Sequence, residues 1–347
     1  EKLEDNLWTA AENLRANSKL KANEYSYPVL GLIFLKFAEN NFQKMEKQIN
    51  AKKNYRHKVI SKEDYLASGV IYLHEKARFQ YLLNLPEGEN LGAKINEAIK
   101  KIELDNPDLV DTLPKIYNIL DNSILIELLR LFDEIPTDIE GDAFGKIYEF
   151  FLSSFAMSEG QKGGEFFTPI SIVKLIVEIL EPYEGRIYDP ACGSGGMFVQ
   201  SAEFVKNHSG KNKKKLSIFG QEKTSDTVKL NKMNLAVHGL AGDIKQGITY
   251  YEDLHSSINK FDYVMANPPF NVKKVDKEKI KDDPRYDLGI PSHDNANYLW
   301  IQIFLNALND NGRAGFVMAN SAAESSGGEL EIRKKIINSH VVDIIVS

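Results

Sequence analysis

The stretch RIYDPACGSGGMFVQSAEFV, residues 186–205, decides the fold class of this chain. It begins with a short β-rich run, passes through a loop that contains Gly193, Gly195 and Gly196, and ends in a helical pattern. Glycines allow a close approach of the backbone and dihedral angles that other residues avoid. A strand, a glycine-rich loop and a helix in this order are typical of doubly wound α/β folds, which bind ligands at the carboxyl edge of their sheet.

Short β-rich runs alternate with helical patterns over the rest of the chain. We predict strands at RIYD, LSIFGQE, FDYVMAN, AGFVMAN and VVDIIV, and helices over residues 196–206, 224–238, 298–309 and 329–338. A further helix over residues 142–157 precedes the first strand. The alternation predicts a Rossmann-like α/β fold, with a mostly parallel sheet and helices on both faces.

The first part of the chain has a purely helical pattern. The runs LWTAAENLR, PVLGLIFLKFAENNF and ILIELLRLF place apolar residues three and four positions apart, as amphipathic helices do. We therefore expect an all-α N-terminal domain over residues 1–138 and an α/β catalytic domain over residues 139–347. The chain stops within the apolar run VVDIIVS, so we expect the second domain to be truncated at its C-terminus.

Composition narrows the choice of function. The 347 residues are 43% hydrophobic and 27% charged, which is ordinary for a globular protein. No apolar run approaches the roughly 20 residues that a membrane span needs, so we expect a soluble chain without a membrane partner. The single cysteine excludes an intrachain disulfide and fits a reducing cytoplasm, and we expect no metal because HExxH and CxxC patterns are missing. With a net charge of −6, a nucleic-acid partner would need local basic patches.

The loop DPACGSGG (189–196) predicts a cofactor site. It lacks the GxGxxG fingerprint of dinucleotide sites, which disfavours a nicotinamide dehydrogenase. The carboxylate of Asp189 would repel a pyrophosphate, so a zwitterionic or cationic ligand suits this strand end better. Glu222 closes the next strand, where a carboxylate can accept hydrogen bonds from both hydroxyls of a ribose. We interpret AGD (241–243) as the end of a third segment, where Asp243 would accept from an adenine amino group.

The tetrapeptide NPPF (267–270) follows the β-rich run FDYVMA. Proline fixes φ near −65° and leaves its carbonyl free as an acceptor, and Asn267 adds a side-chain carbonyl. Two rigid acceptors can hold both hydrogens of an aromatic amine and draw its lone pair out of conjugation. Phe270 offers a flat face for stacking, worth about 1 to 3 kcal/mol per base. With a sulfonium methyl group in the neighbouring loop, NPPF predicts methyl transfer to the amine nitrogen, driven by positioning more than by acid–base catalysis.

Taken together, these motifs resemble those of the amino-group DNA methyltransferases that use S-adenosyl-L-methionine. NPPF matches their catalytic motif and DPACGSGG their first cofactor motif. GGEFFTP (163–169) is similar to the motif that packs over the methionine end of the cofactor, and here it precedes both others. That order resembles the modification subunits of type I restriction-modification systems. Their helical domain is similar to LWTAAENLR, YPVLGLIFLKF, IYLHEKARFQYLL and DAFGKIYEFFL, so the resemblance covers essentially the whole chain.

The resemblance implies a role for each matching residue. The cofactor would be bound by Glu165, Phe166, Phe167, Thr168, Pro169, Ile170, Asp189, Gly193, Ser194, Gly195, Glu222 and Asp243. The target base would be held by Asn267, Pro268, Pro269 and Phe270, and an Asn-led tetrapeptide implies adenine N6 as the target. Transfer to cytosine C5 would need a cysteine nucleophile, usually after proline. Cys192 instead follows Ala191 inside the cofactor loop, and we interpret it as a small packing residue.

The expected partners follow from the chemistry and from the resemblance. An adenine N6 inside a duplex must be flipped out to meet the methyl donor, at a cost of a few kcal/mol. The segments KKNYRHK (52–58) and KVDKEKIKDDPR (274–285) are the local basic candidates for phosphate contact. We expect the rest of the sheet to use the residues after NPPF, and we therefore expect no module among them that reads several base pairs. The resemblance thus implies double-stranded DNA, a specificity subunit shared by two copies of this chain, and a nuclease subunit as a further candidate, in a prokaryotic cytoplasm.

Two alternatives stay open at this point. A related methyltransferase that modifies the side-chain amide (N5) of protein glutamine also uses an Asn-Pro-Pro-aromatic motif, although the upstream position of GGEFFTP argues against it. A non-catalytic assembly scaffold would keep the fold and lose the chemistry. Every predicted cofactor and catalytic position nevertheless carries the expected residue type.

Overall fold

The computed structural model describes residues 2–18, 20–51, 61–136, 143–159, 168–208, 215–292, 294–324 and 326–346. The chain folds into two compact units. The first unit comprises residues 1–163 and 232–240, and the second comprises residues 164–231 and 241–347. In the part of the chain that the structure describes, no helix is both long enough and apolar enough to cross a membrane.

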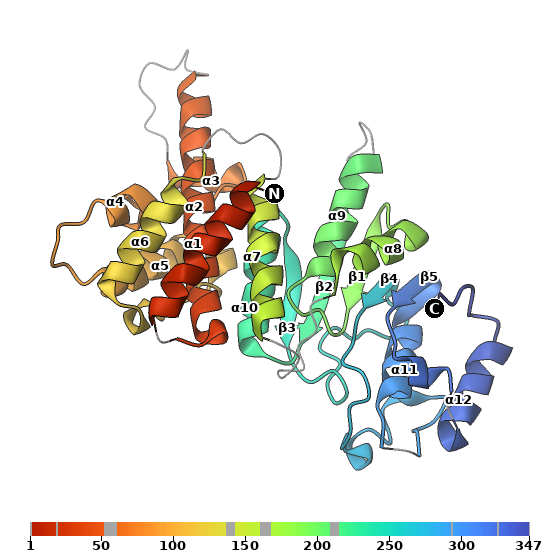
Figure 1. Cartoon of the computed structure of the whole chain (residues 1–347). Helices are drawn as coiled ribbons and strands as arrows, with labels where there is room; N and C mark the ends of the chain where they lie inside the picture. Colours follow the sequence, from red (N-terminus) through yellow and green to blue (C-terminus); the bar gives the residue numbers. More distant parts are fainter. Residues whose placement is uncertain are drawn as a thin grey trace. The chain divides into compact units, whose positions relative to one another are not determined.

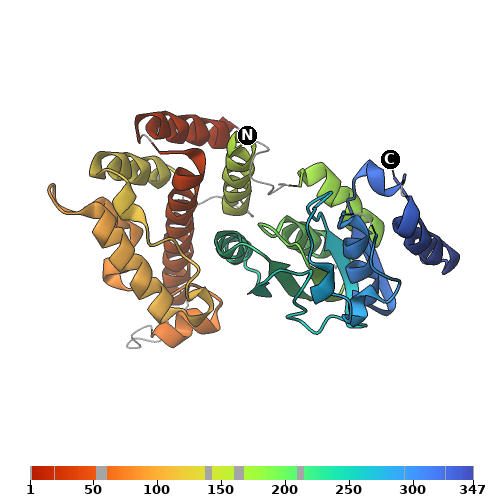
Figure 2. The ribbon, with the colours of Figure 1, turned by 90° about the horizontal axis from the view of Figure 1, so that it is seen from below.

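The first unit is all-helical, as the sequence predicts. Its α-helices are α1 (Lys2–Ser18), α2 (Ala22–Ala51), α3 (Lys62–Ala67), α4 (Phe79–Leu83), α5 (Leu91–Asp105), α6 (Asn122–Asp133) and α7 (Ala143–Glu159). Short 3-10 helices are η1 (Glu75–Ala77), η2 (Pro107–Leu109) and η3 (Tyr117–Ile119). Helix α2 lies between α6 and α7 and packs against both (Figure 2). Helix α7 therefore belongs to the helical unit, whereas the domain boundary at residue 138 stays a prediction.

Aromatic and glycine contacts hold this unit together. Trp8 of α1 packs edge-on against Phe151 and Phe155 of α7, with ring centroids 5.4 and 4.8 Å apart. The hydroxyl of Tyr117 donates to the carbonyl of Pro28 in α2 at 2.9 Å. A Cβ at Gly31 would lie 2.3 Å from the Tyr117 hydroxyl oxygen, so only glycine permits this approach. The apolar spacing read from the sequence thus ends in a close-packed core.

The second unit is built on a five-stranded sheet in which every pairing is parallel. The strands are β1 (Gly185–Asp189), β2 (Leu216–Glu222), β3 (Gly242–Gln246), β4 (Phe261–Ala266) and β5 (Leu308–Phe316). Their order is β3-β2-β1-β4-β5 (Figure 1). The predicted parallel α/β fold is confirmed, and the chain changes direction across the sheet between β1 and β4.

Helices cover both faces of the sheet. The α-helices of this part of the chain are α8 (Ile170–Leu180), α9 (Gly196–His208), α10 (Ser225–Val237), α11 (Asn297–Ala307) and α12 (Gly327–Asn338). Short 3-10 helices are η4 (Lys277–Lys279), η5 (Pro284–Tyr286) and η6 (Asn320–Ala322). Residues 232–240, the end of α10 and the turn after it, are grouped with the first unit.

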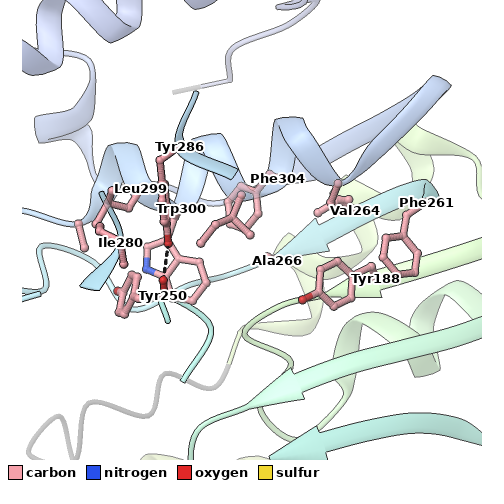
Figure 3. Close-up of a cluster of buried hydrophobic side chains, with 13 residues drawn as sticks. Tyr188, Tyr250, Phe261, Val264, Ala266, Ile280, Tyr286, Leu299, Trp300 and Phe304 are labelled. Atoms are coloured by element: carbon pink, nitrogen blue, oxygen red, sulfur yellow. Dashed lines mark hydrogen bonds between the residues drawn. The ribbon is translucent and has the colours of Figure 1, made fainter. Parts of the chain in front are cut away.

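Successive residues of β4 show which helix covers which face, because neighbouring side chains in a strand point to opposite sides. Met265 lies against α9, where the Ser201 hydroxyl is 3.4 Å from its sulfur. Val264 points the other way, into a buried cluster with Trp300 and Phe304 of α11 (Figure 3). In the same cluster the Tyr286 hydroxyl donates to the Tyr250 carbonyl at 2.8 Å.

Three strand predictions are wrong in detail. The run AGFVMAN (314–320) overlaps β5 only at residues 314–316, because the strand begins at Leu308 and ends at Phe316. The run VVDIIV (341–346) is not a strand in the structure, and Val341, Val342, Ile344, Ile345 and Val346 are all exposed. Its β-branched residues favour a strand, but a strand also requires a hydrogen-bonded neighbour. Conversely, β3 runs through GDIKQ, which the sequence interpretation took only as the end of a segment at Asp243. The helices predicted at 142–157, 196–206, 224–238, 298–309 and 329–338 are confirmed to within a few residues.

Candidate active site

Two motifs far apart in the sequence meet at one edge of the sheet. DPACGSGG begins at the last residue of β1, and NPPF begins directly after β4. These strands are neighbours, with Tyr188 paired to Val264. They also flank the point where the strand order reverses, which is where open α/β sheets bind ligands. The topology therefore brings the two predicted motifs together.

A small cavity lies between the loop after β1 and the end of β4. It is lined by Thr168, Asp189, Ala191, Cys192, Gly193, Ser194, Gly196, Met197 and Asn267. Five predicted site residues are among them, from all three motifs: Thr168, Asp189, Gly193, Ser194 and Asn267. Pro169 and Ile170 lie next to it, exposed at the start of α8. Glu165, Phe166 and Phe167 lie outside the described residues, so their predicted cofactor role stays a prediction.

The glycine loop has the conformation that its sequence predicts. Gly193 and Gly195 both have positive φ, 47° and 87°, which is the left-handed region that favours glycine. The side-chain amide of Asn231 donates to the Gly193 carbonyl at 2.9 Å and is fully buried. A Cβ at Gly195 would approach that same side chain to 3.1 Å. Asn231 therefore braces the loop from α10, and its own Oδ1 is buried without a hydrogen-bond partner among the described residues.

Two carboxylates lie at the loop. Asp189 is only 2% exposed, and its Oδ1 accepts from the Ala191 N–H at 2.9 Å. Burial raises the pKa of Asp189 to about 8, the Ala191 hydrogen bond opposes this, and the nearby Glu222 raises it further. Glu222 accepts from the Gly193 N–H at 3.3 Å and from the Thr224 N–H at 2.9 Å. A cation bound at this edge would relieve the cost of ionising Asp189.

Asn267 is held at the end of β4 by a residue from a distant part of the chain. Its Nδ2 donates to the hydroxyl oxygen of Thr168 at 3.0 Å. Its Oδ1 is buried and has no hydrogen-bond partner in the described part of the chain. Pro268 is buried behind it, while Pro269 and Phe270 are partly exposed. Asn267 thus lines the cavity and carries an unpaired acceptor, which is the type of group that holding an amine requires.

Cys192 packs within the loop, as the sequence interpretation expects. It is 4% exposed, and a Cβ at Gly220 would lie 2.8 Å from its sulfur. Burial raises the pKa of the Cys192 thiol well above its ordinary value, and Asp189 and Glu222 add to the shift. A thiol is a poor nucleophile when its thiolate is disfavoured. This environment suits a packing residue and does not suit covalent catalysis.

The predicted position of Asp243 is wrong. Asp243 is the second residue of β3, and the strand continues to Gln246, which pairs with Glu222. Asp243 itself pairs with Phe219, so it lies away from the carboxyl edge. Its carboxylate is instead 3.4 Å from Lys245 Nζ and 3.5 Å from His255 Nδ1. The adenine-binding role of Asp243 stays untested, but it loses the positional basis on which we predicted it.

The structure bears differently on the two basic segments predicted to contact phosphates. KKNYRHK (52–58) lies outside the described residues. In KVDKEKIKDDPR, Lys274, Lys279 and Lys281 are exposed, but Arg285 is 1% exposed. Its guanidinium donates to Asp283 Oδ2 at 2.6 Å and to the Thr249 carbonyl at 2.9 Å. Arg285 is therefore a structural ion-pair residue, and its inclusion among candidate phosphate contacts is wrong.

The sequence did not predict two asparagines that support the loops of the site. Asn231 and Asn297 are both buried asparagines that hydrogen-bond to the loops after β1 and β4, respectively. Neither lies in a motif, and a single asparagine in a helical pattern carries no signal of its own. The one sequence signal for such a supporting role is a polar residue at a position on the buried side of each helix.

Comparison with known proteins agrees with this geometry. A family model described as N-6 DNA Methylase matches residues 139–347, more than half of the chain. The chain belongs to the N-6 DNA methylase family. A second model, described as the HsdM N-terminal domain, matches residues 3–132. The resemblance based on NPPF, DPACGSGG and GGEFFTP is thus confirmed, and the Rossmann-like unit described above is the methylase fold of this family.

Individual members of the N-6 DNA methylase family and a solved structure are similar over most of the chain. The methylase subunit of the type I restriction enzyme MjaIX of Methanocaldococcus jannaschii is 41% identical, over 99% of this chain and 65% of its own length. The methylase subunit of the type I restriction enzyme HindI of Haemophilus influenzae is 40% identical, over 73% of this chain and 60% of its own length. The chain therefore spans less than two thirds of these relatives. A type I methyltransferase subunit from Streptococcus thermophilus shares the fold, with a TM-score of 0.80, 23% identity, and coverage of 97% and 78%.

Proposed function

We propose that this chain is the modification subunit of a type I restriction-modification complex. It transfers a methyl group from S-adenosyl-L-methionine to N6 of a flipped-out adenine in double-stranded DNA. The observation that carries the proposal is that Asn267, whose buried Oδ1 has no hydrogen-bond partner among the described residues, lines the same cavity as Gly193 and Ser194 of the glycine loop.

The residues at the loop fit the proposed cofactor. S-Adenosyl-L-methionine supplies an electrophilic methyl group on a positively charged sulfur. Gly193 and Gly195 let the backbone approach a ligand closely, and Asp189 and Glu222 make the strand ends acidic. In the described part of the chain, Asp189 has no basic partner, so a bound cation would complete its environment. Glu222 is the last residue of β2 at the same edge of the sheet, where a carboxylate can accept hydrogen bonds from ribose hydroxyls.

The loop after β4 supplies the groups that hold the target. Asn267 Oδ1 and a proline carbonyl accept the two hydrogens of the adenine amino group, and Phe270 stacks on the base. Held in this way, N6 keeps its lone pair directed at the methyl carbon. The N–C bond forms as the C–S bond breaks, the electron pair of that bond stays on sulfur, and N6 then releases one proton to water. Catalysis rests on orientation, which can contribute about 7 to 11 kcal/mol.

Recognition of a DNA site falls to a separate specificity subunit, with two copies of this chain for each copy of that subunit. We expect Lys274, Lys279 and Lys281, which are exposed and follow the catalytic loop, to contact phosphates. A nuclease subunit completes the complex in systems that also cleave DNA. We expect the complex to act in a prokaryotic cytoplasm.

Transfer of label from tritiated cofactor tests the proposal. The full-length chain is incubated with DNA or with a protein mixture, each with and without the specificity subunit, and labelled DNA is digested to nucleosides. We expect label in N6-methyladenine, only when the specificity subunit is present. Label in protein glutamine would favour the related glutamine methyltransferase. Efficient methylation of one defined sequence by the chain alone would contradict the assignment of recognition to another subunit.

A further inference from the structure

The hydroxyl of Thr168 reaches the catalytic loop because α8 is docked firmly on the sheet. Thr168 is two residues before α8, and the Ile172 and Val173 N–H groups bond to the Pro169 carbonyl at 2.9 and 3.2 Å. Helix α8 packs on β5, which pairs with β4. A Cβ at Gly315 of β5 would lie 2.8 Å from Ile176 Cγ2 of α8, so glycine allows a close approach. The start of α8 is thereby fixed beside the end of β4.

The contact between Thr168 and Asn267 anchors the nitrogen end of the amide beside the cavity. The Thr168 hydroxyl oxygen accepts from Asn267 Nδ2 at 3.0 Å. Oδ1 on the opposite branch of the amide is buried and accepts no hydrogen bond from the described residues. Both side chains line the same cavity. An amide turned by 180° would place a donor where the acceptor now lies, and a donor would repel the hydrogens of an amine.

We propose that Thr168 is a positioning residue for Asn267. By accepting from Nδ2, its hydroxyl anchors the amide while Oδ1 stays unpaired, so that Thr168 contributes to methyl transfer through Asn267. This inference rests on the proposed function. It extends that function, because the resemblance assigns Thr168 to cofactor binding and not to the support of Asn267. Buried polar side chains usually satisfy their hydrogen bonds, and the lone pairs of Oδ1 are left for the substrate.

Two substitutions at Thr168 separate its hydroxyl from its shape. Thr168→Val keeps the volume and removes the hydroxyl, whereas Thr168→Ser keeps the hydroxyl. Ser171→Ala, on an exposed position of α8, is the matched control. The full-length chain in complex with its specificity subunit is assayed for single-turnover methylation of adenine and, by calorimetry, for cofactor affinity. Since a misplaced catalytic group costs up to about 100-fold, we expect Thr168→Val to slow methylation roughly 10- to 100-fold.

The accompanying readouts exclude a merely structural role. The affinity of Thr168→Val for the cofactor should stay within about 3-fold of that of wild type. The methylation rate of Thr168→Ser should likewise stay within about 3-fold of the wild-type rate. In an Asn267→Ala background, Thr168→Val should have no further effect, because coupled residues are not additive. The inference is overturned by an unchanged Thr168→Val rate, by additive effects in the double variant, or by a loss of cofactor affinity that matches the loss of rate.

The wild type and Asn267→Ala separate this inference from the proposed function. If wild type methylates adenine, Asn267→Ala does not, and Thr168→Val behaves as wild type, only the role of Thr168 fails. If wild type with its specificity subunit leaves adenine unmethylated, the proposed function itself fails. Circular dichroism and thermal melting of each variant show that it is folded before its rate is compared.

Discussion

Asn271 and Asn297 form a reciprocal pair: the Asn271 N–H donates to Asn297 Oδ1 at 2.9 Å, and Asn297 Nδ2 donates to Asn271 Oδ1 at 3.0 Å. Asn271 directly follows NPPF and has a left-handed φ of 54°. Asn297 is 2% exposed at the start of α11. The buried helix therefore holds the loop that carries the target-binding residues in its turned conformation.

Removal of this pair should impair catalysis more than cofactor binding. Asn297→Ala leaves the Asn271 N–H without its partner, at a cost of about 1 to 3 kcal/mol. The loop after β4 then loses its fixed position, and we expect methylation to fall about 10- to 100-fold. Ser321→Ala is the control, because exposed Ser321 also donates to Asn271 Oδ1, at 3.0 Å, but leaves the Asn297 pair intact. Equal rates for Asn297→Ala and wild type would show that the loop needs no such support.

Asp189 should make stability depend on pH. Burial raises the pKa of Asp189 from 3.8 to about 8, so between these values the folded state binds more protons than the unfolded state. Stability then falls as the pH rises through this window. Asp189→Asn removes the titration and keeps the Oδ1 acceptor for the Ala191 N–H. The melting temperature of the variant relative to wild type should increase from about pH 5 to about pH 8, while its cofactor affinity falls. A difference that is independent of pH would contradict the assignment.

Adjacent glycines in the cofactor loop should respond differently to alanine. Gly195 has a φ of 87°, and a Cβ there would approach Asn231 to 3.1 Å. Gly196 begins α9, and a Cβ there meets nothing within 4 Å. We expect Gly195→Ala to weaken cofactor binding about 10-fold or more, since it strains the backbone by roughly 1 to 2 kcal/mol and displaces Asn231. Gly196→Ala should melt as wild type does, because its methyl group would meet no atom of the described structure, although Gly196 lines the cavity. Calorimetry and thermal melting of both variants test this, and a cofactor affinity of Gly195→Ala equal to that of wild type would count against the loop as the cofactor site.

Arg285 and Lys274 should separate folding from DNA binding. Arg285→Ala leaves Asp283 without its cation and the Thr249 carbonyl without its donor. Breaking a buried ion pair in this way costs about 3 to 5 kcal/mol, so the melting temperature should drop markedly. Lys274→Ala should leave melting unchanged and weaken DNA binding at low salt, because Lys274 is exposed. An Arg285→Ala protein that melts like wild type would place Arg285 back among the DNA contacts.

Much of the fold is predictable from local sequence. RIYD, LSIFGQE and FDYVMA carry enough β-branched and aromatic residues to identify β1, β2 and β4, and the helices between them have clear apolar spacing. VVDIIV has an equally strong pattern and forms no strand. The difference lies in hydrogen-bonded neighbours, which a single sequence does not display. The opposite error occurred at GDIKQ, where the sequence did not predict the strand β3. This strand is short and polar, and it is held by its pairing with β2.

The grouping of the candidate site residues was predictable where they belong to a motif. Asp189, Gly193 and Asn267 line one cavity, as expected, because a parallel sheet brings the ends of its strands to one edge, while their roles stay predictions. Asp243 was misplaced since its position depended on where β3 ends. Tertiary contacts between residues far apart in the chain give Asn231, Asn297 and the Thr168 hydroxyl their roles. Sequence spacing does not predict such contacts.

The most direct test of the central claim compares Asn267→Ala with Glu222→Ala. Each full-length variant, with its specificity subunit, is titrated with S-adenosyl-L-methionine in a calorimeter and assayed for N6-methyladenine in DNA. If Asn267 Oδ1 holds the target amine, Asn267→Ala binds the cofactor within about 3-fold of wild type and loses methyl transfer by about 100-fold or more, as when a preorganised polar contact is removed. Glu222→Ala should weaken cofactor binding first. Full methyl transfer by Asn267→Ala would contradict the mechanism, even though the chain would still belong to the N-6 DNA methylase family.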